Sequence, residues 1–185
     1  MRIVGGRFKG HALAAPAGQA TRPTSDRVRE AMFNILAHGM GDFTVADARV
    51  LDLFAGTGAL GLEAISRGAR FCHFIDEATA ARGVIRRNAD ALGVIGQAKI
   101  WRRDAAALGA CAPLPPFDLV FCDPPYNRGL GERALAGLGA GGWLSPGAVV
   151  VLEEALKAEV ATPEGLSLID ARDYGDTVVR FYRAP

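Results

Sequence analysis

The sequence predicts an α/β domain built on a doubly wound, mostly parallel sheet of seven strands that ends in an antiparallel hairpin. The first observation is that five short apolar runs alternate with segments of helical periodicity between residues 50 and 152. The second is that two further strand-like runs close the chain around a short turn. The third is the length of 185 residues, which is enough for one such domain and too short for two ordinary ones.

The individual elements follow from the spacing of apolar residues and from the positions of glycine and proline. Short apolar runs bounded by turn residues indicate strands, and apolar residues three and four positions apart indicate helices. The expected strands are Val50–Phe54, Phe71–Ile75, Lys99–Arg102, Phe117–Cys122, Ala148–Leu152, Ser167–Ala171 and Thr177–Tyr182. The expected helices are Ala59–Arg67, Ala78–Leu92, a short one after Asp104, and Leu130–Leu138.

The first 40 residues are expected to form a small extension, and residues 41–185 the main domain. Two short strands, Arg2–Val4 and His11–Leu13, are predicted to pair as a hairpin through a glycine-containing turn. Thr24-Ser25-Asp26 has the chemistry of a helix cap, and an apolar stripe at helical spacing follows it. The extension is therefore a β-hairpin followed by a helix over about residues 25–37.

The charge of the chain is unevenly distributed. The formal net charge is +1, but residues 1–30 hold six basic side chains against two acidic ones, a net of +4, and the remaining residues carry −3. A basic arm on a near-neutral body suggests a polyanionic partner. Arg7 and Lys9, near the hairpin tip, could grip phosphates; an ordinary charged surface that keeps an edge hairpin soluble explains them equally well.

Three cysteines, Cys72, Cys111 and Cys122, show no metal-ligand spacing and no pairing pattern, which suits a reducing compartment. The N-terminal residues lack the apolar core of a signal peptide. No apolar run reaches the ~18–20 residues that a membrane span needs. We therefore expect a cytoplasmic protein with no membrane segment and no bound metal.

The stretch Val50–Gly61, VLDLFAGTGALG, contains a strand, a glycine turn and the start of a helix. This arrangement is typical of loops that hold nucleotide cofactors, because glycines allow a sharp turn and close approach of a ligand to backbone N–H groups. Gly56-x-Gly58-x-x-Gly61 fits the dinucleotide fingerprint by count. Asp52, however, precedes the loop inside the strand, where it would face a cationic ligand rather than a pyrophosphate.

Two further acids follow predicted strands. Asp76 comes after the second strand, where a carboxylate suits a bidentate grip on ribose hydroxyls; the alternative is an acid that stabilises the next helix N-terminus. Asp104 comes just after the third strand and could accept a hydrogen bond from an adenine amine; the alternative is a helix N-cap.

Asp123-Pro124-Pro125-Tyr126 ends the fourth strand, because two prolines remove two backbone donors. The Asp123 carboxylate and the Pro124 carbonyl could accept N–H bonds from an exocyclic base amine and orient its lone pair. The prolines would fix the geometry of the loop, and Tyr126 would offer a ring face to the base. The alternative is a simple proline turn with a buried tyrosine.

Asp52-x-Phe54-Ala55-Gly56-x-Gly58 followed by Asp-Pro-Pro-Tyr resembles methyltransferases that use S-adenosylmethionine (SAM) to modify exocyclic amines of nucleobases. The resemblance is closest to the RsmD family and extends essentially from end to end. Its most specific part is Arg22-Pro23-Thr24-x-Asp26-Arg27-Val28-Arg29-Glu30. Further parts are Arg2-Ile3-Val4-Gly5-Gly6, Lys9-Gly10, Leu51 to Gly68, Tyr174-Gly175 and Phe181-Tyr182-Arg183.

The resemblance implies a Rossmann-like class I methyltransferase fold with an N-terminal hairpin extension, SAM as cofactor and S-adenosylhomocysteine as product. It implies methylation of the N2 amine of one guanine in 16S ribosomal RNA, within a 30S assembly particle, by a monomer. The predicted catalytic residues are Asp123, Pro124, Pro125 and Tyr126. The predicted cofactor residues are Asp52, Phe54, Ala55, Gly56, Thr57, Gly58, Asp76, Glu77 and Asp104. The predicted RNA-binding residues are Arg2, Arg7, Lys9, Arg22, Arg27, Arg29 and Arg128. For Arg27 and Arg29 the SAM carboxylate, or Glu30 alone, is an open alternative to RNA phosphate.

Three other functions stay open at the level of sequence. A methyltransferase of the same fold could act on DNA adenine or on a protein glutamine amide, although such enzymes usually carry Asn where this chain has Asp123. A nicotinamide-dependent oxidoreductase would explain the glycines and Asp76 but would leave Asp123–Tyr126 without a role. A catalytically silent RNA-binding module is the third.

Overall fold

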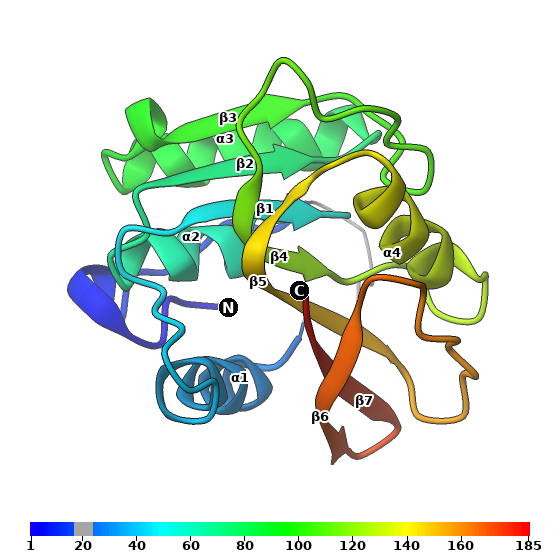
Figure 1. Ribbon diagram of the computed structural model, residues 1–185. Coiled ribbons are helices and arrows are strands. Elements are labelled where there is room, and N and C mark those ends of the chain that lie inside the picture. Colours follow the sequence, from blue (N-terminus) through cyan, green and yellow to red (C-terminus); the bar gives the residue numbers. More distant parts are fainter. Residues whose placement is uncertain (17–23) are drawn as a thin grey trace.

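The computed structural model describes residues 1–16 and 24–185, and it confirms the predicted fold class. One seven-stranded sheet forms the centre of the molecule (Figure 1). Its strands are β1 (Arg49–Leu53), β2 (Phe71–Ile75), β3 (Ala98–Trp101), β4 (Phe117–Cys122), β5 (Leu144–Ala155), β6 (Ser167–Tyr174) and β7 (Thr177–Arg183). Their spatial order is β3-β2-β1-β4-β5-β7-β6; β1 to β5 run parallel, and β7 is antiparallel to both β5 and β6.

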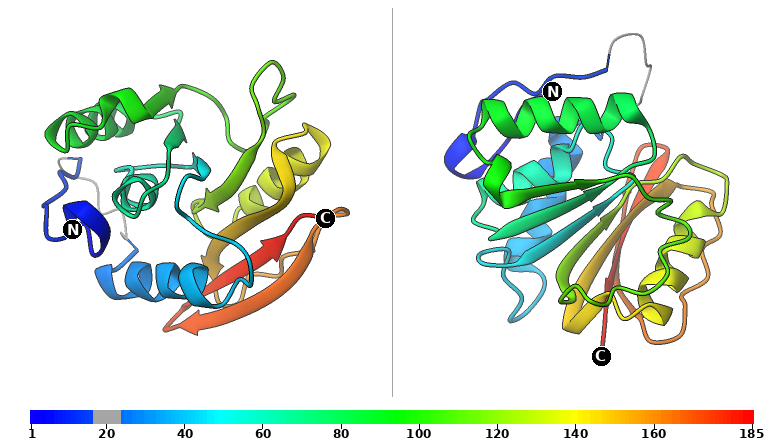
Figure 2. Two further views of the ribbon diagram at one scale, coloured as in Figure 1. Left: turned by 60° about the vertical axis from the view of Figure 1, so that its left-hand side comes forward. Right: turned by 90° about the horizontal axis from the view of Figure 1, so that it is seen from above.

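Helices cover both faces of the sheet. They are α1 (Asp26–His38), α2 (Ala59–Ser66), α3 (Thr79–Ala91) and α4 (Leu130–Ala140), with short 3-10 turns η1 (Gly6–Phe8) and η2 (Ile95–Gln97). Buried residues of α1, α2 and α3 share one apolar cluster with one face of the sheet, and those of α4 share a second cluster with the opposite face. Figure 2 shows α3 and α4 on opposite sides of the sheet.

The alternation of side chains along the central strands produces these two clusters. Val50 belongs to the first cluster and Leu51 to the second, and both are fully buried. On the first face the rings of Phe33 in α1 and Phe121 in β4 lie 5.4 Å apart. The chain leaves β1 toward β2 on one side and reaches β4 on the other, so the strand order reverses between β1 and β4. Ligands of such sheets bind at the carboxyl ends of the strands at this point.

The predicted N-terminal hairpin is only partly correct. Its two arms pair antiparallel at Arg2 and Ala12, with backbone hydrogen bonds from Ile3 to His11 (2.9 Å) and from Leu13 to Met1 (3.0 Å), but the turn between them is the 3-10 turn η1. Ser66 of α2 causes this, because its Oγ donates to the Gly5 carbonyl (2.6 Å) and accepts from the Phe8 amide (3.0 Å). The turn therefore packs against α2.

The prediction of a short helix after Asp104 is wrong, because the structure has turns and irregular backbone between β3 and β4. Asp104 Oδ1 accepts from the Ala106 amide (2.8 Å), which closes a turn, and Leu108 and Cys111 are buried against the second cluster. A single helical turn is costly to nucleate, so burial of these side chains decides the backbone here.

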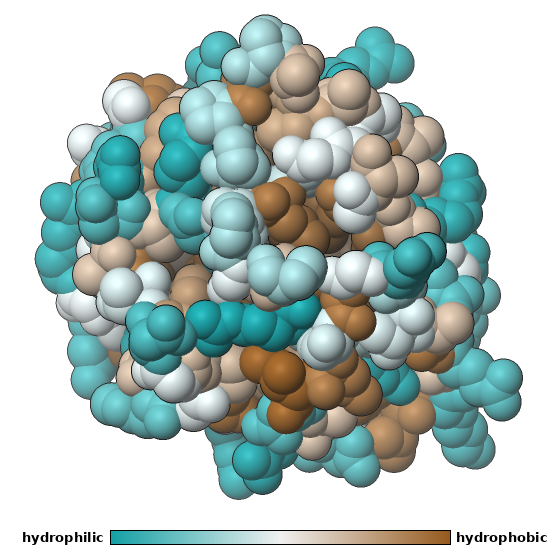
Figure 3. All heavy atoms as spheres, viewed as in Figure 1, coloured by the Kyte–Doolittle hydropathy of each residue, from teal (hydrophilic) through white to brown (hydrophobic). Residues whose placement is uncertain are grey.

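The predicted division at residue 40 stays a prediction. The N-terminal residues and the sheet share one apolar cluster, because Ile3, Met32 and Phe33 pack together with Phe121. On the face seen in Figure 3, hydrophobic residues occur in small separate groups among hydrophilic ones. Within residues 1–16 and 24–185, no helix is long and apolar enough to cross a membrane.

Candidate active site

A cleft of about 650 Å³ opens at the carboxyl ends of β1, β2 and β4. It brings together most of the residues that the sequence motifs single out, although these are far apart along the chain. The predicted residues that line it are Asp52, Phe54, Ala55, Gly56, Thr57, Asp76, Glu77, Asp123, Pro124, Pro125, Tyr126, Arg29 and Arg128. Gly58 and Asp104 are not among its lining residues.

The glycine loop, residues 54–58, turns the chain from β1 into α2. Gly56 and Gly58 have φ values of 57° and 77°, and Gly58 is the N-cap of α2. A side chain at Gly58 would crowd Ile85 and Phe74, at about 3.2 and 3.3 Å from its Cβ. Gly58 is thus required by turn geometry and packing, whereas Gly56 faces the cleft.

Asp52 is almost fully buried below the glycine loop, with 1% of its surface exposed. Its Oδ2 accepts a hydrogen bond from the Gly61 amide (3.0 Å) in the first turn of α2. Burial, together with the nearby charge of Asp76, raises the pKa of Asp52 to about 8, although the Gly61 N–H opposes this shift. Within residues 1–16 and 24–185, no cationic side chain pairs with the Asp52 carboxyl. A buried carboxyl of this kind, lining a cleft, suits the positively charged ligand that the sequence predicts.

Asp76 connects the glycine loop to the start of α3. Its Oδ2 accepts from the Gly56 amide (2.9 Å), and its Oδ1 accepts from the Ala78 amide (2.8 Å). The bond from the Ala78 amide stabilises the N-terminus of α3, which is the alternative role that the sequence offers for Asp76. Each carboxylate oxygen retains further acceptor capacity on the cleft side, so the ribose-binding role stays a prediction.

Asp104 lies in the turn that follows β3, where its Oδ1 accepts a hydrogen bond from the Ala106 amide (2.8 Å). Its two neighbours, Arg103 and Ala105, line the cleft instead. The Arg103 guanidinium lies over two indole rings, 5.8 Å from the centroid of Trp101 and 5.4 Å from that of Trp143. Arg103 was not predicted, because nothing in its spacing separates it from the other surface arginines.

The Asp123–Tyr126 loop is tied to residues that sequence reasoning missed. Tyr126 donates its hydroxyl to Glu153 Oε1 (2.7 Å), and Thr24 Oγ1 lies 2.6 Å from Glu153 Oε2 and 3.3 Å from Asp123 Oδ2. Burial and the nearby charges of Glu153 and Asp52 hold the pKa of Asp123 well above its usual range.

The register of the sheet explains the position of Glu153. Cys122 of β4 pairs with Leu152 of β5 in parallel, so the residues that follow them, Asp123 and Glu153, lie side by side. A signal for this position was present in the sequence, because Glu153 and Glu154 directly follow the apolar run of β5. The predicted strand ended at Leu152, whereas β5 continues to Ala155. Glu153 and Glu154 point to opposite faces, as successive strand residues do.

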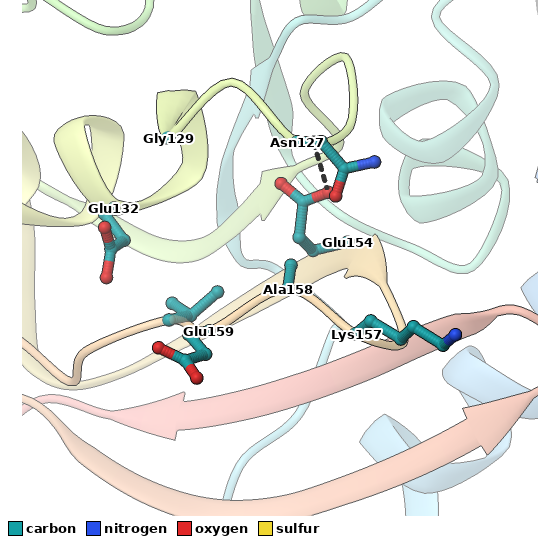
Figure 4. Close-up of a pocket in the computed structure, with 8 residues that line it drawn as sticks. Asn127, Gly129, Glu132, Glu154, Lys157, Ala158 and Glu159 are labelled. Carbon is teal, nitrogen blue, oxygen red and sulfur yellow. Dashed lines mark hydrogen bonds between the residues drawn. The ribbon is translucent and has the colours of Figure 1, made fainter.

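Glu154 fixes the far end of the loop in a separate hollow of about 300 Å³ (Figure 4). Its Oε1 accepts from the Asn127 amide (3.2 Å) and from its neighbour Ala155 (2.8 Å). The backbone of Asn127 has a φ of 59°, in the left-handed region that residues other than glycine seldom occupy and that asparagine tolerates better than most. The acidic pair of β5 thus anchors the loop on both sides of the sheet.

The prediction that Arg29 binds RNA is contradicted by its burial, since its side chain is completely inaccessible. Its Nη2 lies 2.8 Å from Asp26 Oδ1 and also donates to the Arg2 carbonyl, and its Nε lies 3.9 Å from Glu63 Oε2. Arg29 joins α1, α2 and the N-terminal segment.

The other predicted RNA-binding residues lie at the surface, except Arg22, which lies outside the described residues. Arg7 Nη2 donates to Gln97 Oε1 (2.7 Å), and Arg2 lies 3.5 Å from Asp26. These contacts leave most of the side chains accessible to a polyanion. The exposed members are Arg2, Arg7, Lys9, Arg27 and Arg128.

The strand order, the closing antiparallel hairpin, the glycine loop after β1 and the Asp-Pro-Pro-Tyr loop after β4 define a class I methyltransferase. The chain belongs to the family described as Conserved hypothetical protein 95, whose model matches residues 1–183, and this confirms the resemblance to the RsmD family.

The names of relatives and of solved structures agree with this assignment. The chain is 36% identical over 184 residues to "Ribosomal RNA small subunit methyltransferase D" of Escherichia coli (strain K12), covering 99% of this chain and 89% of that protein. It is 31% identical over 185 residues to the protein of the same name from Haemophilus influenzae, covering 99% and 93%. The solved structure of "Putative methyltransferase yhhF from Escherichia coli" superimposes with a TM-score of 0.82 at 36% identity, covering 100% of this chain and 97% of that one.

Proposed function

We propose that this protein transfers the methyl group of SAM to the exocyclic N2 amine of a guanine in 16S ribosomal RNA. The observation that carries the proposal is that the glycine loop, Asp52, Asp76 and the Asp123–Tyr126 loop open into one cleft. The names of the relatives, which specify ribosomal RNA of the small subunit, support the choice of substrate.

The cofactor end of the cleft suits SAM. When bound, SAM supplies a methyl group on a positively charged sulfur. Asp52 would face the cationic end of the molecule, and the glycine loop would allow close approach of its backbone. Asp76 would accept from the ribose hydroxyls, and Glu77, which is exposed beside it, would border the same groups.

The substrate end suits a planar base with an exocyclic amine. Such an amine is a weak nucleophile, because its lone pair is delocalised into the ring. Asp123 and the Pro124 carbonyl would accept its N–H bonds and direct the lone pair toward the methyl group. Tyr126 would stack on the base, since its hydroxyl is held by Glu153 and Thr177 and its ring is therefore fixed.

We propose that the exposed basic residues of the extension and Arg128 bind the RNA backbone, within a 30S assembly particle. Arg22 has this role as a sequence-based prediction only. The proposed enzyme is a cytoplasmic monomer that needs no metal.

Analysis of cellular nucleic acids tests this function. Deleting the gene is expected to remove N2-methylguanosine from one site of 16S RNA, and a plasmid copy is expected to restore it, as mass spectrometry of nucleosides would show. If 16S RNA is unchanged while DNA loses methyladenine or a protein loses methylglutamine, the alternative substrate of the same fold is correct.

Replacing Arg7 and Lys9 together with alanine is expected to weaken RNA binding and to reduce its salt dependence. Each phosphate contact that is lost lowers the slope of log K against log salt by about 0.7–0.9. Filter binding to 16S RNA from low to high salt measures both effects. An unchanged affinity and slope would assign these residues to the structure of the hairpin alone.

SAM affinity is expected to rise with pH up to about 8, because the buried Asp52 carboxyl must lose its proton to face a cation. Below that pKa the gain can approach about tenfold per pH unit, the limit for release of one proton per ligand. Calorimetry in two buffers of different ionisation heat measures the proton release. Asp52→Asn is expected to abolish that release; the same release in this variant would contradict the role of Asp52.

A further inference from the structure

A connected set of hydroxyl and carboxyl groups lies behind Asp123. Glu153 is 5% exposed, and each of its carboxyl oxygens accepts a hydrogen bond from a hydroxyl. The Tyr126 hydroxyl lies 2.7 Å from Oε1, and Thr24 Oγ1 lies 2.6 Å from Oε2. Thr24 Oγ1 also lies 3.3 Å from Asp123 Oδ2. Behind Tyr126, Thr177 Oγ1 lies 3.2 Å from its hydroxyl.

The protons of this set can be counted. A threonine hydroxyl has one proton to donate, and a tyrosine hydroxyl has one. The short contacts assign both protons to Glu153, which accepts on both oxygens as an ionised carboxylate does. Thr24 Oγ1 then turns a lone pair toward Asp123 Oδ2, so a hydrogen bond between them requires a proton on Asp123.

The charges around Asp123 favour the same state. Glu153 of β5 and Asp52 of β1 lie near it, Tyr126 of its own loop donates to Glu153, and Glu154 adds its negative charge from the opposite face of β5. Arg29 and Arg128 line the same cleft, but Arg29 is already paired with Asp26. Like charges this close and this buried disfavour a second carboxylate beside Glu153.

We propose that Asp123 acts as a neutral carboxyl, that its Oδ1 accepts the substrate amine as a carbonyl oxygen, and that Thr24 and Glu153 remove the amine proton. This inference rests on the proposed function. Glu153 is the positioning residue of the site and the final proton acceptor, and Thr24 is the link between the two carboxyl groups.

The atoms and charges of the step balance. The N–C bond forms as the S–CH₃ bond breaks, and the electron pair of the broken bond stays on sulfur. The amine proton passes to Asp123 Oδ1, the proton of Asp123 Oδ2 passes to Thr24 Oγ1, and the original Thr24 proton passes to Glu153 Oε2. The sulfonium charge and the Glu153 charge disappear together, so the buried site gains no net charge.

Two variants of Thr24 test the relay. Thr24→Val keeps the shape and removes the hydroxyl, and it is expected to lower kcat on 30S particles by about 10²-fold, at the low end of acid–base contributions. Thr24→Ser keeps the hydroxyl and is the matched control, expected to stay close to wild type. KM for SAM is expected to be similar in both. Equal kcat values for the two variants would overturn the relay.

Infrared spectroscopy of the SAM-free protein tests the neutral state of Asp123 without any reaction. At neutral pH the difference between wild type and Asp123→Asn is expected to contain the C=O stretch of a protonated carboxyl. A carboxylate band in its place would overturn the proposal. If the wild type itself methylates no 16S RNA, the proposed function fails and the relay with it, while the spectrum still decides the state of Asp123.

Discussion

Asp123→Ala is expected to lower kcat for methyl transfer by about 10³-fold, because the substrate amine loses the acceptor that orients its lone pair. SAM affinity is expected to stay within a few-fold of wild type, since the residues that we propose face the cofactor lie elsewhere, Asp52 in β1 and Asp76 just after β2. Single-turnover transfer to 30S particles measures the rate, and calorimetry measures the affinity.

Asp173→Ala is the matched control for this variant. Asp173 is exposed on the edge strand β6, so the same change of residue is expected to leave both quantities unaltered. A large loss of SAM affinity in Asp123→Ala would show that Asp123 belongs to the cofactor end of the cleft. A rate near that of wild type would exclude it as the acceptor of the amine.

Arg29→Ala is expected to lower the free energy of unfolding by about 3–5 kcal/mol, the range for removing one partner of a buried ion pair. Glu63 would keep Arg67 at 2.8 Å but lose the charge on its other side, and the Arg2 and Thr24 carbonyls would lose their donors. Urea denaturation followed by circular dichroism measures the loss.

Arg27→Ala tests the same helix at an exposed position, and its effect on stability is expected to be within about 0.5 kcal/mol. For RNA affinity the variant with the larger effect is the other one. Arg27→Ala is expected to weaken RNA binding, whereas Arg29→Ala is expected to weaken it only to the extent that the protein unfolds. Stability close to wild type in Arg29→Ala would contradict the structural role that burial assigns to this residue.

The burial of Arg29 could have been predicted from its spacing. Arg29, Met32, Phe33 and Leu36 stand at positions i, i+3, i+4 and i+7, which is one face of a helix. The residue type suggested a surface cation, and the family motif around it suggested RNA. One partner that makes burial possible, Asp26, stands at the i,i+3 spacing of a helical ion pair. The other, Glu63, could not be identified, because it is close only in the folded chain.

The parallel sheet and its glycine loop were predictable because each signal is local. Alternating apolar runs and helices specify a doubly wound sheet, and the residues that end its strands must meet at one edge. The relation of Glu153 and Thr24 to Asp123 was not predictable in this way. It depends on the register of β5 and on contacts between residues far apart in the sequence. Thr24 is separated from Asp123 by 99 positions and from Glu153 by 129.

Segments without a strong periodic signal were the least predictable. The hairpin turn folds onto Ser66 of α2, and the stretch after Asp104 gives up its helical propensity to bury Leu108 and Cys111. In both places a contact with a distant element outweighs the local preference.

Transfer of tritium from labelled SAM to 30S particles is the most direct test of the central claim. The particles come from cells that lack this enzyme, and the nucleosides of their 16S RNA are separated after the reaction. The account predicts label in N2-methylguanosine, and none when Asp123→Ala replaces the wild type. Label in another nucleoside or in protein, or no label from a protein that binds SAM, would contradict it.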